Sequence, residues 1–273
     1  MKLSFVLIII LLIFSGCAHF YYMPQTHNVP LFKERNDVQL SAGGSFHWPD
    51  MSANSIQIAW AAGKNWALAG NYMSSSGETD PVYSSGRGHY ADGAIGFFHP
   101  INEELIFEVF SGYGQSRQHH KYGNMISEGT YNQSRTIDYG SSDLWFRKYY
   151  LQPAIGVSMN AVDIALSLRF SGLSFYRINN AILTDTVNKY EYNSPLYSRV
   201  DDIANQRNYY LAEPAVTIRA GWQFVKLQFQ WANTINIQPK ETPSFIKSQF
   251  VFGFTFSFAE RWLKKNDKSR AGN

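Results

Sequence analysis

Eight charged residues occur at alternate positions in stretches where apolar side chains alternate with small or polar ones. Successive side chains of a β-strand point to opposite faces, so these charges would share the face opposite the apolar residues. Buried charges are tolerated when they are paired. We interpret this set as a paired network that closes the inside of a barrel, and a narrow conduit or a binding cleft as the functional alternative. Its four acids and four bases are Asp92, Glu108, Asp163 and Glu213 and Lys148, Arg169, Arg219 and Lys226.

Catalytic and metal-binding motifs are absent from the sequence. There is no Gly-x-Ser-x-Gly element, which a typical serine hydrolase would carry. His119 and His120 are adjacent, and adjacent side chains of a strand point apart, so the pair is a poor chelate. We therefore expect no catalytic residue, no metal and no cofactor, and a protein that is not an enzyme. Candidates that could meet at the loop end of a barrel are His47, His89, His119, His120, Asp138, Asp143, Asp201 and Asp202.

Cys17 is the one cysteine, which excludes an internal disulfide. It follows a basic start, Lys2, and an apolar run from Leu3 to Phe14 that is too short for a membrane span of about 20 residues. Phe14-Ser15-Gly16-Cys17 resembles the bacterial lipobox, in which the cysteine is acylated. We predict a lipoprotein signal peptide over residues 1–16 and a lipid anchor on Cys17.

The strands that must position the charges are best seen near the end of the chain. Phenylalanine occupies every second position from Phe250 to Phe258, with small or polar residues between. A transmembrane barrel produces this pattern by turning apolar side chains to lipid and polar ones to the lumen. Ten stretches alternate in this way, and we predict strands at 38–48, 55–62, 66–74, 89–98, 104–115, 144–159, 162–175, 209–222, 225–237 and 249–258.

Connections between these strands alternate between tight turns and long loops, as in outer-membrane barrels. The sequence thus predicts an all-β fold, an antiparallel up-and-down transmembrane barrel of about ten strands over residues 37–258. Aromatic residues near strand ends would form interfacial girdles. The aromatic content is 16%, and a net charge of +3 gives no argument for nucleic-acid binding. The candidate girdle residues are Trp48, Trp66, Tyr72, Trp145, Tyr149 and Trp222.

Residues 17–36 contain two prolines and no alternation, which predicts an extended, lipidated tether. We predict that residues 259–273 form a basic periplasmic tail. Pro24-Gln25-Thr26-His27-Asn28-Val29-Pro30-Leu31, followed by Val38-Gln39-Leu40-Ser41-Ala42, is similar to the opening of a group of uncharacterised outer-membrane barrel lipoproteins of Bacteroidota. The resemblance covers about a tenth of the chain and implies a β-barrel in the cell envelope. Surface lipoproteins of that phylum tend to carry acids after the cysteine. Residues 18–21 carry none, so we expect the anchor to face the periplasm.

These observations favour a structural or surface-interaction role in the bacterial outer membrane, with a plugged polar lumen. The partners would be outer-membrane lipid and an extracellular protein or glycan at the long polar loops, 116–143 and 176–206. One alternative is an outer-membrane enzyme, a protease or a lipid-modifying enzyme, acting at the loop end. The omptin proteases have this strand number, but no omptin motif is present. A second alternative is a periplasmic lipocalin-like barrel with inverted faces that binds an apolar ligand.

Overall fold

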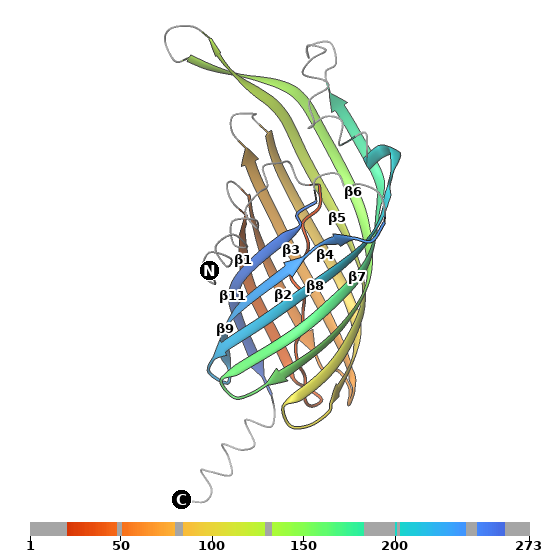
Figure 1. Cartoon of the computed structure of the whole chain (residues 1–273), viewed down its shortest axis with the longest axis vertical. Helices are drawn as coiled ribbons and strands as arrows, with labels where there is room; N and C mark the ends of the chain where they lie inside the picture. The colour runs from red at the N-terminus through yellow and green to blue at the C-terminus, as the bar shows by residue number, and fades with distance from the viewer. Residues whose placement is uncertain are drawn as a thin grey trace, which may run out of the picture.

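The alternating stretches form the wall of a closed antiparallel barrel (Figure 1). The structure is a computed structural model that describes residues 21–47, 51–79, 84–128, 133–182, 200, 203–238 and 245–259. Its strands are β1 (Val38–His47), β2 (Met51–Trp60), β3 (Trp66–Thr79), β4 (Ser84–Pro100), β5 (Leu105–Glu128), β6 (Gln133–Ser158), β7 (Val162–Ile182), β8 (Asn208–Gly221), β9 (Val225–Asn233), β10 (Ile235–Asn236) and β11 (Ser248–Phe258).

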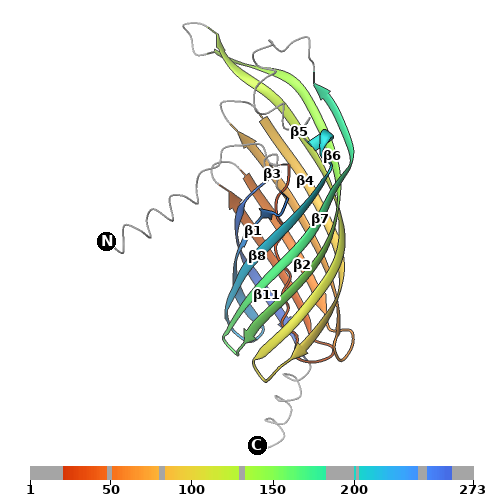
Figure 2. The same ribbon diagram turned by 45° about the vertical axis from the view of Figure 1, so that its right-hand side comes forward.

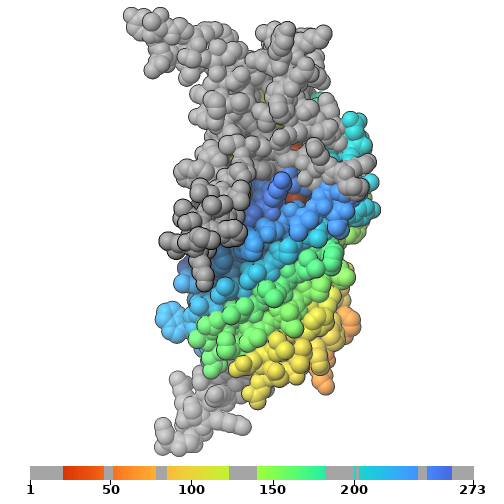
Figure 3. Space-filling view, in the orientation of Figure 1, coloured from red at the N-terminus to blue at the C-terminus, as the bar shows by residue number. Residues whose placement is uncertain are grey.

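Each strand pairs with its neighbour in the chain, and β11 closes the ring between β1 and β9. The two-residue β10 pairs with the loop-side part of β8 and stands outside the ring of ten. The first residue of β1, Val38, lies opposite Phe258 at the end of β11, so both strands meet at the end of the barrel that carries the tight turns. Figure 3 shows the strands as tilted bands side by side on the outer wall. The predicted ten-stranded barrel is confirmed.

The phenylalanine ladder of β11 points outward. Phe254 is 53% exposed and Phe258 is 55% exposed, whereas Thr255 between them is 1% exposed. Exposed apolar side chains continue around the wall on the other strands. They form an apolar band on the outside, where lipid would lie, and polar residues lie inside. The inverted faces of a lipocalin-like barrel are therefore wrong. Among the described residues, no helix is long and apolar enough to cross a membrane.

Aromatic residues border this band at both ends. Trp60, Trp66 and Trp222 lie at the turn end, and Tyr113 and Tyr149 face each other across β5 and β6 near the loop end. Indole and phenol rings prefer the membrane interface because one edge is apolar and the other polar. Of the predicted girdle residues, Trp66, Tyr149 and Trp222 thus agree with the band, whereas Trp145 lies beyond its loop-side end. Trp48 lies outside the described residues.

The polar segment 116–143, predicted to be a loop, is mostly strand. β5 and β6 remain paired up to Glu128 and Gln133, and together they project beyond the rest of the barrel (Figure 1). Beyond the membrane, neither face of a hairpin needs to be apolar, so this part of the two strands has no apolar period in the sequence. β7 likewise continues to Ile182, into the predicted loop 176–206.

Residues 21–32 cross the lumen as an extended segment, which we call the luminal strap. Every residue of the strap is buried, and His27 and Val29 are fully inaccessible. Tyr21 contacts Tyr122 in the loop-side half of β5, and Phe32 packs on Phe98 near the turn end. Figures 1 and 2 show the strap as a thread inside the ring of strands. The tether predicted over residues 17–36 is extended, but its described part runs through the barrel.

Candidate functional site

The main chain of the luminal strap is bound by glutamine side chains of the wall. Gln230 on β9 accepts a hydrogen bond from the His27 amide (2.7 Å) and donates one to the His27 carbonyl (3.0 Å). This bidentate pair gives His27 the two hydrogen bonds that a neighbouring strand would give. Buried peptide groups need such partners, since an unsatisfied one is costly.

Three further glutamines, from three other strands, act in the same way. The Nε2 atom of Gln57 on β2 donates to the Thr26 carbonyl (2.9 Å), and that of Gln152 on β6 donates to the Asn28 carbonyl (2.8 Å). Gln39 on β1 donates to the Pro30 carbonyl (3.1 Å). The strap is therefore held along its length by the wall as a whole, through contacts that depend on its main chain.

Side chains of the strap add a second set of contacts in the middle of the lumen. His27 Nδ1 lies 2.7 Å from Ser167 Oγ, and Asn28 Nδ2 donates to Asn71 Oδ1 (3.0 Å). Thr26 Oγ1 lies 3.2 Å from Ser55 Oγ. These contacts fix the register of the strap, because a shift by one residue would replace each polar side chain by its neighbour.

A buried ion pair lies beneath the loop end of the strap. Lys148 Nζ is 2.8 Å from Glu213 Oε2, and both side chains are almost inaccessible. The Tyr22 hydroxyl donates to Glu213 Oε1 and accepts from Lys148, so the strap joins the pair directly. Ser171 Oγ also donates to Glu213 (2.7 Å). Burial of two charges is tolerated here because each is paired and hydrogen-bonded.

Arg169 is fully buried and binds neutral groups, with no carboxylate of the described residues within ion-pair distance. Its guanidinium donates twice to Gln152 Oε1 (3.0 and 2.6 Å) and also to the carbonyls of Gln25 and Thr26. It lies 4.7 Å above the ring of Tyr150. The paired network that the sequence predicts therefore does not extend to Arg169, because Gln152 and main-chain carbonyls of the strap take the place of a carboxylate.

The other predicted luminal charges also point inward. Lys226 pairs with Asp163 (2.7 Å), and Glu108 Oε2 accepts from the Leu31 amide of the strap (3.0 Å). Arg219 donates to Gln228 (2.8 Å) in place of the expected carboxylate. Asp92 accepts from Asn71 and from the Tyr150 hydroxyl. Of the eight charges, two acid–base pairs form direct ion pairs, and the rest bind neutral side chains or the strap.

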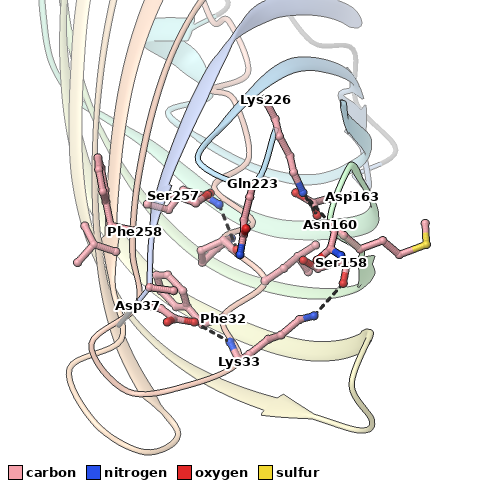
Figure 4. Close-up of a pocket in the computed structure, with 16 residues that line it drawn as sticks. Phe32, Lys33, Asp37, Ser158, Asn160, Asp163, Gln223, Lys226, Ser257 and Phe258 are labelled. Carbon is pink, nitrogen blue, oxygen red and sulfur yellow. Dashed lines mark hydrogen bonds and ion pairs between the residues drawn. The ribbon is translucent and has the colours of Figure 1, made fainter. Parts of the chain in front are cut away.

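A cavity of about 130 Å³ opens at the turn end, where the strap leaves the lumen (Figure 4). Lys33 reaches across it to the Ser158 carbonyl (2.8 Å), and the Lys33 amide donates to Asp37 (3.2 Å). The Lys226–Asp163 pair forms another part of its lining. Polar contacts thus close this mouth around the strap, and the described lining contains no nucleophile beside a general base.

The loop-end candidates whose side chains the structure describes are His89, His119, His120 and Asp143, and they do not assemble into a catalytic group. His119 faces outward, 3.0 Å from Asp143, while His120 points inward and its ring contacts Tyr21. The neighbouring histidines point apart, as expected for a strand. His89 lies 2.8 Å from the Tyr72 hydroxyl on the outer wall. Among the described residues no group of three or more His, Cys, Asp or Glu could hold a metal. The side chains of His47 and Asp138, and residues Asp201 and Asp202, lie outside the described part of the chain, as does Cys17.

The residues missed by sequence reasoning are those of the strap and the glutamines that bind it. A signal was present: inward positions near the middle of several strands carry an uncharged amide, which needs a partner when buried. Wall residues alone offer few partners for so many amides. This surplus would have indicated a polypeptide backbone inside the barrel. The buried, inward-facing glutamines are Gln39, Gln57, Gln152, Gln228 and Gln230, and all of them except Gln228 bind the strap.

Comparison with known proteins shows similarity to outer-membrane barrels at the level of the fold. No family model matches, and no curated protein matches. The outer membrane protease OmpT from Escherichia coli matches with a TM-score of 0.42 and 11% identity, over 82% of this chain and 97% of that one. The translocator domain of the autotransporter NalP from Neisseria meningitidis gives 0.42 and 8%, over 82% and 86%. LpxR from Salmonella typhimurium gives 0.36 and 7%, over 81% and 99%. The closed antiparallel barrel is shown by the strand pairing of this chain, and these similarities support no activity.

Proposed function

We propose that the protein is a lipid-anchored barrel of the bacterial outer membrane whose own N-terminal segment plugs the lumen. Its role is structural or in surface interaction, with the projecting β5–β6 hairpin and the loop end as the surface for a protein or glycan. The observation that carries the proposal is the strap: glutamines from four strands bind its main chain, and Tyr22 completes a buried ion pair. The strap occupies the middle of the lumen, where a conduit or a ligand would have to lie.

The position of the strap also bears on the lipid anchor. Tyr21 lies in the loop-side half of the barrel beside Tyr122, which is nine positions beyond Tyr113 of the aromatic girdle. Cys17 is four positions before Tyr21, so the two residues can be at most about 14 Å apart, whereas the apolar band of such barrels is about 25 Å tall. An acylated Cys17 would thus lie on the loop side of the barrel and could not reach the turn-side leaflet. We therefore replace the expected periplasmic anchor with an anchor on the cell surface.

Disulfide trapping tests the plug. Thr26 Oγ1 and Ser55 Oγ are 3.2 Å apart, so cysteines at both positions should form a disulfide on mild oxidation of the full-length protein in membranes. The matched control joins Thr26→Cys with Ser76→Cys, because Ser76 is exposed on the outer wall. We expect a cross-link in the first variant and none in the second. Equal yields in the two variants would contradict a strap inside the lumen.

The anchor is tested by two measurements on the same cells. A fatty-acid analogue should label the wild type and not the Cys17→Ser variant. A short epitope that replaces residues 18–20 should be bound by antibody on intact cells, because this segment would lie at the surface. Labelling of both chains would exclude Cys17 as the acylated residue. Antibody binding only after the outer membrane is permeabilised would place the anchor in the periplasm.

A further inference from the structure

Three arginines gather on the outer wall of β5, β6 and β7, beyond the loop-side end of the apolar band. Arg117 and Arg177 lie on either side of Trp145 in one row of the sheet, with their guanidinium carbons 5.3 and 4.7 Å from its ring centre. Arg147, two residues away on β6, lies 4.4 Å from the ring of Tyr176. All three arginines are exposed. We call these five residues the arginine–aromatic patch.

The height of the patch on the wall matches the headgroup layer of a membrane. Arg147 is two residues beyond the girdle residue Tyr149, and Arg117 is four residues beyond Tyr113. At about 3.4 Å per residue, with a tilt near 40°, these steps correspond to roughly 5 and 10 Å along the membrane normal. Toward the turn end, the same face carries exposed apolar side chains such as Leu151 and Ile155.

The positive charge of the patch is not balanced by the protein. No guanidinium of the patch forms an ion pair with a described carboxylate, and Asp143, on the same face, is bound to His119. Exposed bases are denser on this side of the barrel, where Arg87 on β4 and Lys121 on β5 also face outward. Beyond the band, the outward positions of β2 and β3 hold uncharged Ser52, Asn54, Ser74 and Ser76. Charges that serve only to solvate the surface would have no reason to gather on one side of the barrel.

The geometry of the patch suits a phosphate group. A guanidinium stacked on an aromatic ring is held in place while its N–H edge stays free to form a fork with two phosphate oxygens. Beside Arg117 and Trp145, an open groove of about 240 Å³ continues to Tyr72 and His89, and its lining also includes Gln115 and Tyr176. A headgroup could therefore bind with its phosphate on the arginines and its polar remainder in the groove.

We propose that the arginine–aromatic patch binds the phosphorylated headgroup of an anionic lipid in the loop-side leaflet. A lipid fits better than a soluble anion because apolar wall lies next to the patch, where acyl chains would pack on Leu151 and Ile155. The inference rests on the barrel crossing a membrane. It does not depend on the plug or on Cys17, so the tests above can fail without affecting it.

Native mass spectrometry of the full-length protein in detergent tests the proposal, with bis-phosphorylated lipid A as the probe. The test variant carries Arg117→Gln, Arg147→Gln and Arg177→Gln. The control variant carries Arg35→Gln, Lys64→Gln and Lys247→Gln, three exposed bases away from the patch. One basic residue near an anionic membrane surface contributes about fivefold in binding. We therefore expect roughly 100-fold weaker lipid binding in the test variant and wild-type binding in the control.

Two further arms separate a lipid site from an adventitious one. Dephosphorylated lipid A should bind wild type and test variant equally weakly, because the phosphate is the recognised group. Inorganic phosphate at the same concentration should not displace the lipid. Unchanged binding in the test variant, or displacement by inorganic phosphate, would overturn the proposal. Wild-type heat-modified mobility of the test variant on a gel is the check that its barrel is folded.

Discussion

At the scale of single residues, the arrangement of the interior depends on the hydrogen bonds and ion pairs of its buried polar atoms. Lys148 and Glu213 form a pair that Tyr22 completes, while Arg169 binds a glutamine and two carbonyls. The balanced count of acids and bases in the sequence suggested four pairs, but a buried charge can equally be stabilised by neutral hydrogen-bond partners. Removal of one partner from a buried pair is the most sensitive probe of this network.

Lys148→Ala should lower the free energy of unfolding by about 3–5 kcal/mol, because the Glu213 carboxylate would remain buried without its cation. Lys64→Ala, at an exposed turn, should change it by less than about 0.5 kcal/mol. Urea unfolding in detergent, followed by tryptophan fluorescence, measures both. The double variant Lys148→Met with Glu213→Leu should lose less than Lys148→Ala alone. A Lys148→Ala protein as stable as Lys64→Ala would show that the pair does not stabilise the lumen.

At the scale of elements, the wall binds the luminal strap inside the barrel without adding it to the sheet as a further strand. Pro24 and Pro30 lack an amide hydrogen and cannot donate in a regular ladder. Beyond one main-chain bridge, in which the Tyr22 carbonyl accepts from the Ile246 amide (3.0 Å), the strap is held by side chains of the wall. In turn, inward amides of Gln39, Gln57, Gln152 and Gln230 use the main chain of the strap as a hydrogen-bond partner. Each element therefore stabilises the other.

Gln230→Leu should expose this dependence, because it removes both hydrogen bonds to the His27 peptide while keeping the volume similar. Each buried peptide group left without a partner costs about 1–3 kcal/mol. We expect hydrogen exchange of the His27 amide to become at least about fivefold faster. Gln115→Leu, on the outer wall, is the control and should leave this amide unchanged. Equal exchange in both variants would contradict a main-chain contact with Gln230.

Phe254→Arg tests the outward face of β11. An arginine at the middle of the bilayer on the lipid side costs about 2–4 kcal/mol in such barrels. We expect a strong loss of folded protein in membranes, measured by heat-modified mobility on a gel. Ser76→Arg also faces outward, but it lies beyond the band and should fold normally. Thr255→Arg is expected to be harmful too, since Thr255 is 1% exposed in a filled lumen.

At the scale of the whole molecule, the barrel is a wall built around its own N-terminal segment. The ring of ten strands closes through β1, β11 and β9, and the strap fills the space that a barrel slightly larger than eight strands leaves open. Wild-type protein should therefore show no steady, large conductance in planar bilayers.

Replacement of residues 22–31 by a glycine–serine segment of equal length should open the lumen. Such a segment keeps the connection to β1 but loses Tyr22, the register contacts of His27 and Asn28, and the prolines. We expect conductance from this variant, and its suppression by a synthetic peptide of residues 18–36. A large conductance from the wild type would contradict the plug, as would a closed, folded replacement variant.

The wall of this barrel follows from residue order. Alternation of apolar and polar residues has the same period as the strand, so Phe250 to Phe258, the ten strands and the inward positions of the charges could be predicted from residue order alone. The resemblance of residues 24–42 to a lipoprotein group stays a prediction, as does acylation of Cys17.

Only the tertiary structure decided what fills the lumen and which groups bind one another. A segment such as residues 21–32 has no period of its own, because its partners come from β1, β2, β6, β7 and β9 in turn. The partners of Arg169 and the continuation of β5 and β6 beyond the membrane were equally invisible. These features depend on distances across a closed barrel, and local sequence patterns record only which face a side chain occupies.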